Sequence, residues 1–237
     1  MLSNEEMSAQ TLELLRTNGG CRLPCWWGFT PDVTDLQRLV SHFHGATAMG
    51  TAYVQTDASA VLVNVTWRPP LGGQPDSPIL ALTVRFCVSD AASDDCYGKN
   101  PFYAEPMYPS PPYILATYGL PTQAYISYDI GLHAMGLGSD LYFLFLDYSE
   151  RGWILMYQME IDSEQPMLRA CLNSAQVQLT LWSPDHAAMA RELSMPDDTG
   201  LKTVEAATGL SLQEFYDYYA NASNQPCLES PRDLYQQ

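Results

Sequence analysis

The feature that most constrains the fold is a pattern that occurs twice along the chain, a short helix followed by three strand-like runs. In the first copy, Thr30 is suited to cap a helix over residues 31–43, and Pro31 suits its first position. In the second copy, Ser110 begins a helix that ends at Gly119. The strand-like runs are rich in β-branched and aromatic residues: 51–56, 60–68, 79–88, QAYISYDI, LYFLFLDYS and GWILMYQMEI.

This composition predicts consecutive antiparallel strands, and in residues 79–88 apolar and more polar residues alternate with the period of a strand that has one covered face. The turn SERG, residues 149–152, joins the last two runs as a hairpin. The predicted fold is therefore α+β, an antiparallel meander sheet with helices on one face. Two related halves are expected, residues 1–109 and 110–237, either as separate units or within one continuous domain.

Three further elements are expected outside the repeated pattern. Residues 5–16 have helical spacing and end at TNGG, and residues 176–182 have the composition of a strand. Near the end, Ser211 and Glu214 form a capping box, in which each side chain accepts a backbone N–H at the other residue. A helix over residues 212–220 follows from it.

Composition excludes several partners. The chain has 237 residues and a formal charge of −16, with 11 Lys and Arg against 27 Asp and Glu. Lys99 and Lys202 are the only lysines, so no basic stripe is available for nucleic acid or an anionic membrane surface. No run approaches the ~18–20 apolar residues of a membrane span, and the acidic start does not resemble a signal peptide. We therefore expect no membrane insertion in this form.

The cysteines indicate an oxidising compartment. Their number is even, they are scattered over the whole chain, and no C-x-x-C pair occurs, which favours disulfides over a metal site. A free Cys25 would be a candidate nucleophile, because a helix is expected shortly after it, but the disulfide interpretation competes directly and is favoured. The six expected disulfide cysteines are Cys21, Cys25, Cys87, Cys96, Cys171 and Cys227.

Three motifs in this order carry a resemblance: CRLPCWWG, YILATYGLPTQAYISY, and EAATGLSLQEFY followed by CLESP. The chain resembles, from about residue 11 onwards, uncharacterised exported bacterial proteins found mainly in Chloroflexota. One departure is Asp32, where the family pattern has a glycine after the proline. In topology alone, the chain is loosely similar to the α+β units of outer-membrane assembly lipoproteins and β-lactamase inhibitor proteins. The resemblance implies an exported protein that lacks its signal peptide here.

The resemblance also implies a disulfide pattern. Cys21, Cys25, Cys171 and Cys227 match the shared motifs, whereas Cys87 and Cys96 do not. The expected pairs are Cys87 with Cys96, and Cys21 and Cys25 each with Cys171 or Cys227. A mutual bridge between Cys21 and Cys25 across Pro24 is not expected. CRLPCWWG would then stabilise the fold through its disulfides rather than form a reactive site.

Metal and cofactor motifs are weak. None of the four histidines, His42, His44, His133 and His186, has a partner at the i, i+4 spacing of a helical zinc site. The acidic segment DAASDD lacks the ligand spacing of a calcium loop, and GLHAMGLG lacks the strand-to-helix setting of a phosphate loop. We expect no metal and no cofactor.

Two groups of residues remain candidates for function. Four carboxylates near predicted strand ends leave a glycosidase possible, since such an enzyme needs only a carboxylate pair: Asp129, Asp140, Asp147 and Glu160. Aromatic residues in and near the loop PFYAEPMYPSPPY either cover the sheet or form an exposed binding surface. The candidate binding residues are Tyr103, Tyr108, Tyr113 and Trp153.

The sequence favours an exported, disulfide-stabilised, non-catalytic binding or assembly module of the cell envelope or extracellular space. It would use the open face of the sheet or the aromatic loop to bind a protein or glycan. The alternatives are a secreted hydrolase acting through unidentified carboxylates, and a self-associating structural subunit of an extracellular assembly. Enzymatic activity is the less favoured of these hypotheses.

Overall fold

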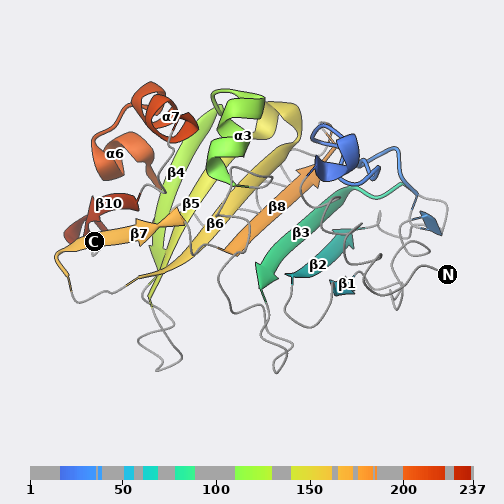
Figure 1. The fold of residues 1–237 in the computed structure, drawn as a ribbon, viewed down its shortest axis with the longest axis horizontal. Helices are drawn as coiled ribbons and strands as arrows, with labels where there is room; N and C mark the ends of the chain where they lie inside the picture. The colour runs from blue at the N-terminus through green and yellow to red at the C-terminus, as the bar shows by residue number, and fades with distance from the viewer. Residues whose placement is uncertain are drawn as a thin grey trace.

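The computed structural model describes residues 17–35, 37–38, 51–55, 61–68, 78–88, 110–129, 140–161, 165–172, 176–183, 185, 200–221 and 227–235. Within them, an eight-stranded sheet has the order β1-β2-β3-β8-β6-β5-β4-β9, and every neighbouring pair is antiparallel. A separate two-stranded ribbon pairs β7 with β10. The predicted α+β class is confirmed (Figure 1).

The two predicted meanders are present, and a strand from the later part of the chain joins them. The first meander is β1 Thr51–Gln55, β2 Val61–Arg68 and β3 Ala81–Val88; the second is β4 Gln123–Asp129, β5 Asp140–Tyr148 and β6 Trp153–Ile161. The strand β8, Gln176–Trp182, lies between β3 and β6 and pairs with both. The short strand β9, Lys202–Thr203, pairs with β4. Both meanders therefore belong to one sheet, although the proposed domain boundary itself stays a prediction.

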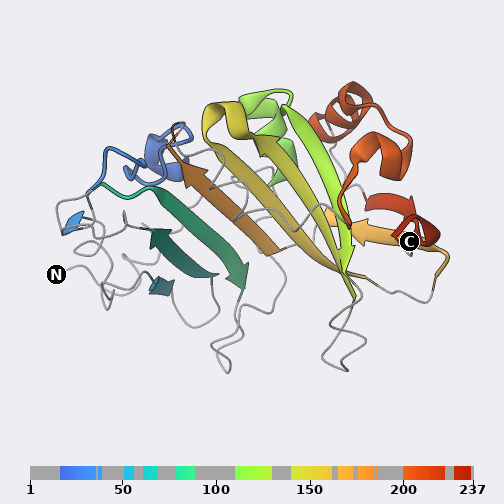
Figure 2. The same cartoon turned by 180° about the vertical axis from the view of Figure 1, so that it is seen from behind.

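The helices begin where their capping residues predict. The helix α3, Pro111–Tyr118, has Ser110 as N-cap and Gly119 as C-cap, and α7, Leu212–Ala220, begins with the complete capping box of Ser211 and Glu214. Between β9 and α7 lies α6, Val204–Thr208. The 3-10 turns are η1 Asn18–Gly20, η3 Ser149–Arg151 and η7 Arg232–Tyr235. Figures 1 and 2 show α3 in front of the sheet from one side and behind it from the other.

The main core lies on the face of the sheet that α3 covers. Register places one continuous apolar layer across the central strands, for example Leu82 opposite Leu181 and Leu146 opposite Leu155. All four side chains are fully buried. Helix residues such as Ile114 and Phe215 join the same cluster, as do Trp26 and Phe29 from the N-terminal segment. Burial of this layer is what fixes the register, since a slip of one residue would turn it outward.

The second face of the sheet is less open than the sequence suggested. Phe145, Ile154 and Trp182 lie on it, and their exposed fractions are 1%, 3% and 1%. Tyr125 and Met156 pack against this smaller cluster and are half-buried. The expectation that this face as a whole is free for binding is therefore wrong at its central positions.

Two local predictions are corrected. The helix expected from Pro31 does not begin there: Asp32 has φ of +63°, Val33 is exposed, and residues 30–34 form a turn. The Asp35 carboxylate instead accepts a hydrogen bond from Arg38 N at 2.6 Å, the contact of a helix N-cap. In addition, Cys171 lies on β7, Met167–Cys171, rather than in a loop. The helix predicted over residues 5–16 lies outside the described residues.

The β7–β10 ribbon and η7 form what we call the C-terminal clamp, residues 167–171 and 227–235. Its strand β10, Cys227–Pro231, pairs with β7 so that Cys227 lies opposite Cys171, and the two are disulfide-bonded. Leu168 and Leu228 point into the main core and are fully buried. The clamp therefore closes one end of the core on the helix-bearing side of the sheet (Figure 1).

Candidate functional site

The N-terminal motif forms a compact loop, residues 18–29, closed by a disulfide between Cys21 and Cys25. This overturns the expected pairing of these cysteines with Cys171 or Cys227, which are bonded to each other. The Cα atoms of Cys21 and Cys25 lie 5.6 Å apart, an ordinary separation for a disulfide, because the chain turns sharply between them. The predicted pair of Cys87 and Cys96 involves side chains outside the described residues and stays a prediction.

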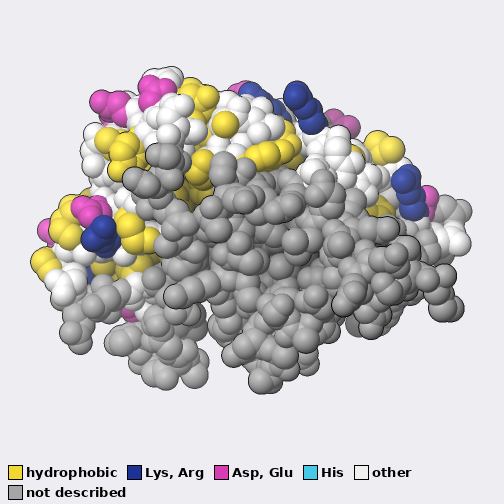
Figure 3. Space-filling view, in the orientation of Figure 1, with side chains coloured by type: hydrophobic (Ala, Val, Ile, Leu, Met, Phe, Trp, Pro, Cys, Tyr) yellow, Lys and Arg dark blue, Asp and Glu magenta, His cyan; other side chains and the backbone are white. Residues whose placement is uncertain are grey.

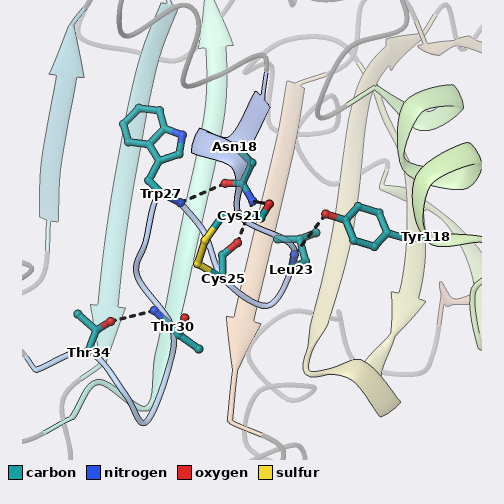
Figure 4. The surroundings of a disulfide bond; sticks show 8 residues. All are labelled: Asn18, Cys21, Leu23, Cys25, Trp27, Thr30, Thr34 and Tyr118. Carbon is teal, nitrogen blue, oxygen red and sulfur yellow. Dashed lines mark hydrogen bonds between the residues drawn. A yellow bond between two sulfur atoms is a disulfide. The ribbon is translucent and has the colours of Figure 1, made fainter.

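A buried asparagine organises this loop from inside. Asn18 has an exposed fraction of 1%, and its Nδ2 donates to the carbonyl oxygens of Cys21 and Cys25 at 2.9 and 2.8 Å. Its Oδ1 accepts from the backbone N–H of Trp27 at 3.1 Å (Figure 4). One side chain thus satisfies three backbone groups of the loop, which would otherwise need other partners.

The loop docks against the sheet and α3. Trp26 is fully buried and stacks on Trp27, with ring centroids 4.5 Å apart. The backbone N–H of Leu23 donates to the Tyr118 hydroxyl at 3.2 Å, which joins the loop to the end of α3 (Figure 4). Gly152 lies beside the loop in the β5–β6 turn, where an added Cβ would approach the carbonyl oxygen of Trp182 to 2.7 Å. Only glycine fits there without displacing backbone.

Four segments meet at this point and form what we call the Tyr–Arg surface: the N-terminal loop, the end of α3, the β5–β6 turn, and α7. Tyr113, Tyr118 and Tyr216 are half-buried on it, and Arg22, Leu120 and Arg151 are exposed. Figure 3 shows hydrophobic side chains along the upper part of this face, over α3 and α7, with both Lys or Arg and Asp or Glu side chains nearby. Mixed aromatic and arginine character is typical of protein-binding surfaces.

Arg151 is held in place by its neighbours. Its Nη1 donates to the carbonyl oxygen of Tyr118 at 2.5 Å, and its guanidinium carbon lies 5.5 Å from the centre of the Tyr148 ring. The Tyr148 hydroxyl in turn donates to the carbonyl oxygen of Gly119 at 2.6 Å. The Arg151 residue is nevertheless exposed, so its guanidinium is accessible to a ligand. Arg151 is therefore positioned for a ligand that accepts hydrogen bonds.

Burial raises the pKa of two tyrosines at this surface, Tyr118 and Tyr148. It raises the pKa of Tyr118, and the Leu23 N–H and the charge of Arg22 oppose it only in part. Burial also raises the pKa of Tyr148 well above its ordinary value, although the charge of Arg151 acts in the opposite direction. Near neutral pH both phenols are uncharged. The formal charges of the surface are therefore those of its two arginines and of the exposed carboxylates Glu150, Glu214 and Asp217.

The predicted aromatic binding residues are only partly located here. Tyr113 lies on α3, half-buried and part of the Tyr–Arg surface. Trp153 does not belong to a binding surface: it is fully buried and stacks on Tyr148 at 3.9 Å between ring centroids. A tryptophan at the first position of β6, next to the turn, points into the main core because of the strand register. Tyr103 and Tyr108 lie outside the described residues.

The structure separates the first pair of candidate carboxylates. Asp140 and Asp147 lie at opposite ends of β5 and, seven residues apart, on opposite faces of the sheet. That separation is on the order of 20 Å, against the ~5–9.5 Å that glycosidase pairs require. Asp147 is buried and accepts from Ser149 N at 2.7 Å, a local turn contact. These two residues therefore cannot act as a pair.

For the other two candidate carboxylates, Asp129 and Glu160, the structure describes only the backbone. Asp129 and Glu160 both lie in register with Leu141, on either side of it, which puts them two strands apart on one face. Their side chains are outside the described set. No catalytic role follows from register alone.

Asp140 belongs to a buried polar cluster beneath the C-terminal clamp. Its carboxylate accepts a hydrogen bond from the Tyr128 hydroxyl, and the Tyr142 hydroxyl donates to Ser230 Oγ at 3.0 Å. Burial, together with Asp140, raises the pKa of Tyr128 to about 12. Asp140, Tyr142 and Ser230 have exposed fractions of 1% or less. A substrate cannot reach this cluster without displacing the clamp, so its evident role is to attach the clamp to the sheet.

Metal ligation is not indicated by the part of the chain that the structure describes. In those residues no group of three or more His, Cys, Asp or Glu side chains is arranged to hold an ion. All four histidines and the DAASDD segment lie outside them. Among the described helices, none has the length and apolar character needed to cross a bilayer.

Sequence reasoning missed most of the residues that make up the Tyr–Arg surface. TNGG predicts a helix end and gives no sign of the buried role of Asn18, and SERG predicts a turn without indicating the contacts of Arg151. The available signal was the scarcity of basic residues in an acidic chain. Arg22 and Arg151 are two of the 11 basic residues, and they lie in the CRLPCWWG motif and in the SERG turn, which the sequence analysis singled out.

Comparison of the chain with protein-family models, curated proteins and solved structures gives no significant match.

Proposed function

We propose that the protein is an exported, disulfide-stabilised, non-catalytic binding or assembly module of the cell envelope or extracellular space. It binds its partner through the Tyr–Arg surface. The observation that carries the proposal is the meeting of exposed arginines and half-buried tyrosines where hydrogen bonds join the N-terminal loop, the end of α3 and the β5–β6 turn. Such a surface is positioned before binding, which lowers the entropic cost of forming a complex.

Two further observations support this proposal. Disulfides at both ends of the described chain, Cys21–Cys25 and Cys171–Cys227, suit an oxidising compartment. The alternative, a secreted hydrolase, loses support because Asp140 is sealed beneath the clamp and Asp147 lies on the other face. The buried centre of the second sheet face also moves the expected binding site from that face to the Tyr–Arg surface.

Labelled protein on glycan and peptide arrays tests the proposal. We expect wild-type protein to bind a defined subset of probes, and Arg22→Ser with Arg151→Ser to lose that binding. Arg169→Ser is the matched control, since Arg169 is exposed on the clamp and pairs with Glu229 at 3.4 Å. Arg22→Ser alone provides a milder variant, because Arg22 is exposed.

Two results would contradict the proposal. One is product release from a glycoside or peptide panel that disappears when a single carboxylate is changed. The other is array binding that the double arginine variant leaves unaltered. Concentration-dependent self-association in size-exclusion runs, abolished by the same double variant, would instead identify the partner as another copy of the chain.

A further inference from the structure

The Cys21–Cys25 disulfide joins no two distant parts of the chain. The sequence predicts bridges from this loop to Cys171 and Cys227, which would explain the motif as a structural link, yet the two cysteines of the loop are bonded to each other. A bridge between residues four apart constrains the unfolded chain far less than one that spans 56 residues. Stability alone therefore gives little reason for this bridge.

The loop holds both cysteines in place without the bridge. Asn18 Nδ2 donates to the carbonyl oxygens of Cys21 and Cys25, and the Asn18 carbonyl accepts from Cys21 N at 3.0 Å (Figure 4). The backbone N–H of Cys25 donates to the carbonyl oxygen of Arg22 at 3.0 Å. The two Cα atoms are 5.6 Å apart. Two thiols in this loop would therefore stay close enough to form the bridge again, and the loop can accommodate both oxidation states.

The charge of the loop favours exchange of its disulfide. Residues 17–31 contain a single charged side chain, Arg22, in a chain that has 27 acidic and 11 basic residues. A cation beside a cysteine favours the thiolate, which is the form that attacks and leaves during exchange. Acidic residues follow outside this stretch, at Asp32, Asp35 and, in the adjoining β5–β6 turn, Glu150.

The second disulfide lies in a different electrostatic setting. All four cysteines of the two bridges are partly exposed, so access alone does not separate them. Near Cys171 and Cys227, however, Arg169 forms an ion pair with Glu229 at 3.4 Å, two positions along the same pair of strands. The cation nearest in sequence to that bridge is therefore paired with a carboxylate, and the N-terminal bridge is the better candidate for exchange.

We propose that Cys21–Cys25 is a thiol–disulfide exchange site that oxidises a dithiol of a partner protein. A thiolate of the partner attacks one sulfur of the bridge and forms a mixed disulfide, while the other sulfur leaves as a thiolate and takes up a proton. The partner's second thiolate then attacks the mixed disulfide. The partner leaves with a disulfide, and the loop keeps two thiols. Each chain thus accepts two electrons and two protons from one dithiol, a reaction that goes beyond the proposed binding function.

Reaction of the oxidised full chain with a synthetic peptide that carries two reduced cysteines tests this proposal. Samples are quenched with acid, alkylated and mapped by mass spectrometry. We expect the peptide disulfide and the thiols of Cys21 and Cys25 to appear in equal amounts. These thiols should form at least about tenfold faster than those of Cys171 and Cys227 in the same molecule. The circular dichroism spectrum should not change, because the loop keeps its backbone contacts.

Two variants test the contribution of charge. Arg22→Ser should slow the reaction about threefold near neutral pH, because it removes the charged side chain of the loop. Arg169→Ser is the matched control, an exposed arginine near the other bridge, and it should leave the rate at Cys21–Cys25 unaltered.

Three results would overturn the proposal. Thiols that appear first at Cys171 and Cys227, or that appear at Cys21 and Cys25 only in urea, would make the N-terminal bridge purely structural. Glutathione that opens Cys21–Cys25 as fast and as completely as the peptide, at equal thiol concentration, would replace the protein dithiol by a small thiol. Equal rates for Arg22→Ser and wild type would remove the electrostatic reason for exchange at this loop. Array binding is measured separately, so each of these results leaves the proposed binding function standing.

Discussion

The two disulfides of the described structure hold chain segments in different ways. Cys21 and Cys25 are four residues apart, and their bridge lies inside a loop that the Asn18 side chain already organises. Cys171 and Cys227 are 56 residues apart, and their bridge joins two strands directly opposite one another. The first bridge reinforces a local shape, whereas the second encloses a long stretch of chain.

This difference indicates which interactions each region depends on. Closing a loop removes more conformational entropy from the unfolded chain as the loop becomes longer, which favours the C-terminal bridge as the larger contributor to stability. The N-terminal loop has little entropy to lose through its bridge. Its conformation depends on the three hydrogen bonds of Asn18 and on the burial of Trp26.

Removal of the C-terminal bridge is expected to have the largest effect. Cys171→Ser with Cys227→Ser should lower the free energy of unfolding by about 4 kcal/mol, the chain-entropy value for a loop of this length. Urea unfolding followed by tryptophan fluorescence measures this. The same double change at Cys21 and Cys25 is the control and should cost about 2 kcal/mol. Equal losses in the two variants would show that loop length does not govern the difference.

Asn18→Ala is expected to cost about 3 kcal/mol, more than loss of the disulfide beside it. The substitution leaves two carbonyl oxygens and one N–H in a buried loop without their partner, and it places alanine at a φ of +52°. The measurement is again urea unfolding, with Asn221→Ala as an exposed asparagine control. A loss smaller than that of the Cys21 and Cys25 double variant would show that the bridge, rather than the amide, determines the loop.

The strands and helix caps of this fold could be predicted because their signals are local. The β-branched and aromatic composition of the runs identified all six meander strands, and Ser110, Gly119 and Ser211 marked helix ends at the correct residues. The position of β8 between the two meanders could not be predicted, because it depends on which strand edges meet in three dimensions.

The candidate site was less predictable for the same physical reason. Tyr118, Arg151 and Leu23 are far apart in sequence, and only the packing of the loop against α3 and the β5–β6 turn brings them together. The predicted disulfide partners of Cys21 and Cys25 were wrong, because the prediction followed the resemblance rather than local geometry. A turn containing Pro24 brings Cys21 and Cys25 within bridging distance, and no spacing rule stated that in advance.

The smallest expected effect concerns the C-terminal clamp at high pH. Tyr128 has a pKa of about 12 in the folded protein against an ordinary value of 10, because it is buried beside Asp140. Since the folded pKa is the higher one, its contribution to stability is fully present below pH 10 and is lost as the pH rises towards 12. Tyr128→Phe should therefore make the fall in unfolding free energy between pH 10 and pH 12 shallower, by about 1 kcal/mol after allowance for solvent screening.

Urea unfolding of freshly prepared samples at pH 8, 10, 11 and 12 measures this slope. Tyr218→Phe is the matched control, because the Tyr218 side chain is 58% exposed and lies on the outer side of α7. Tyr142 and Tyr219 also have raised pKa values, so the stability of the Tyr128→Phe variant should still fall in this pH range. Curves for Tyr128→Phe and wild type that run parallel from pH 10 to 12 would mean that this phenol ionises equally easily in the folded and unfolded chains. The clamp would then be held by the Cys171–Cys227 bridge and its apolar contacts, with no contribution from the protonated Tyr128 beneath it.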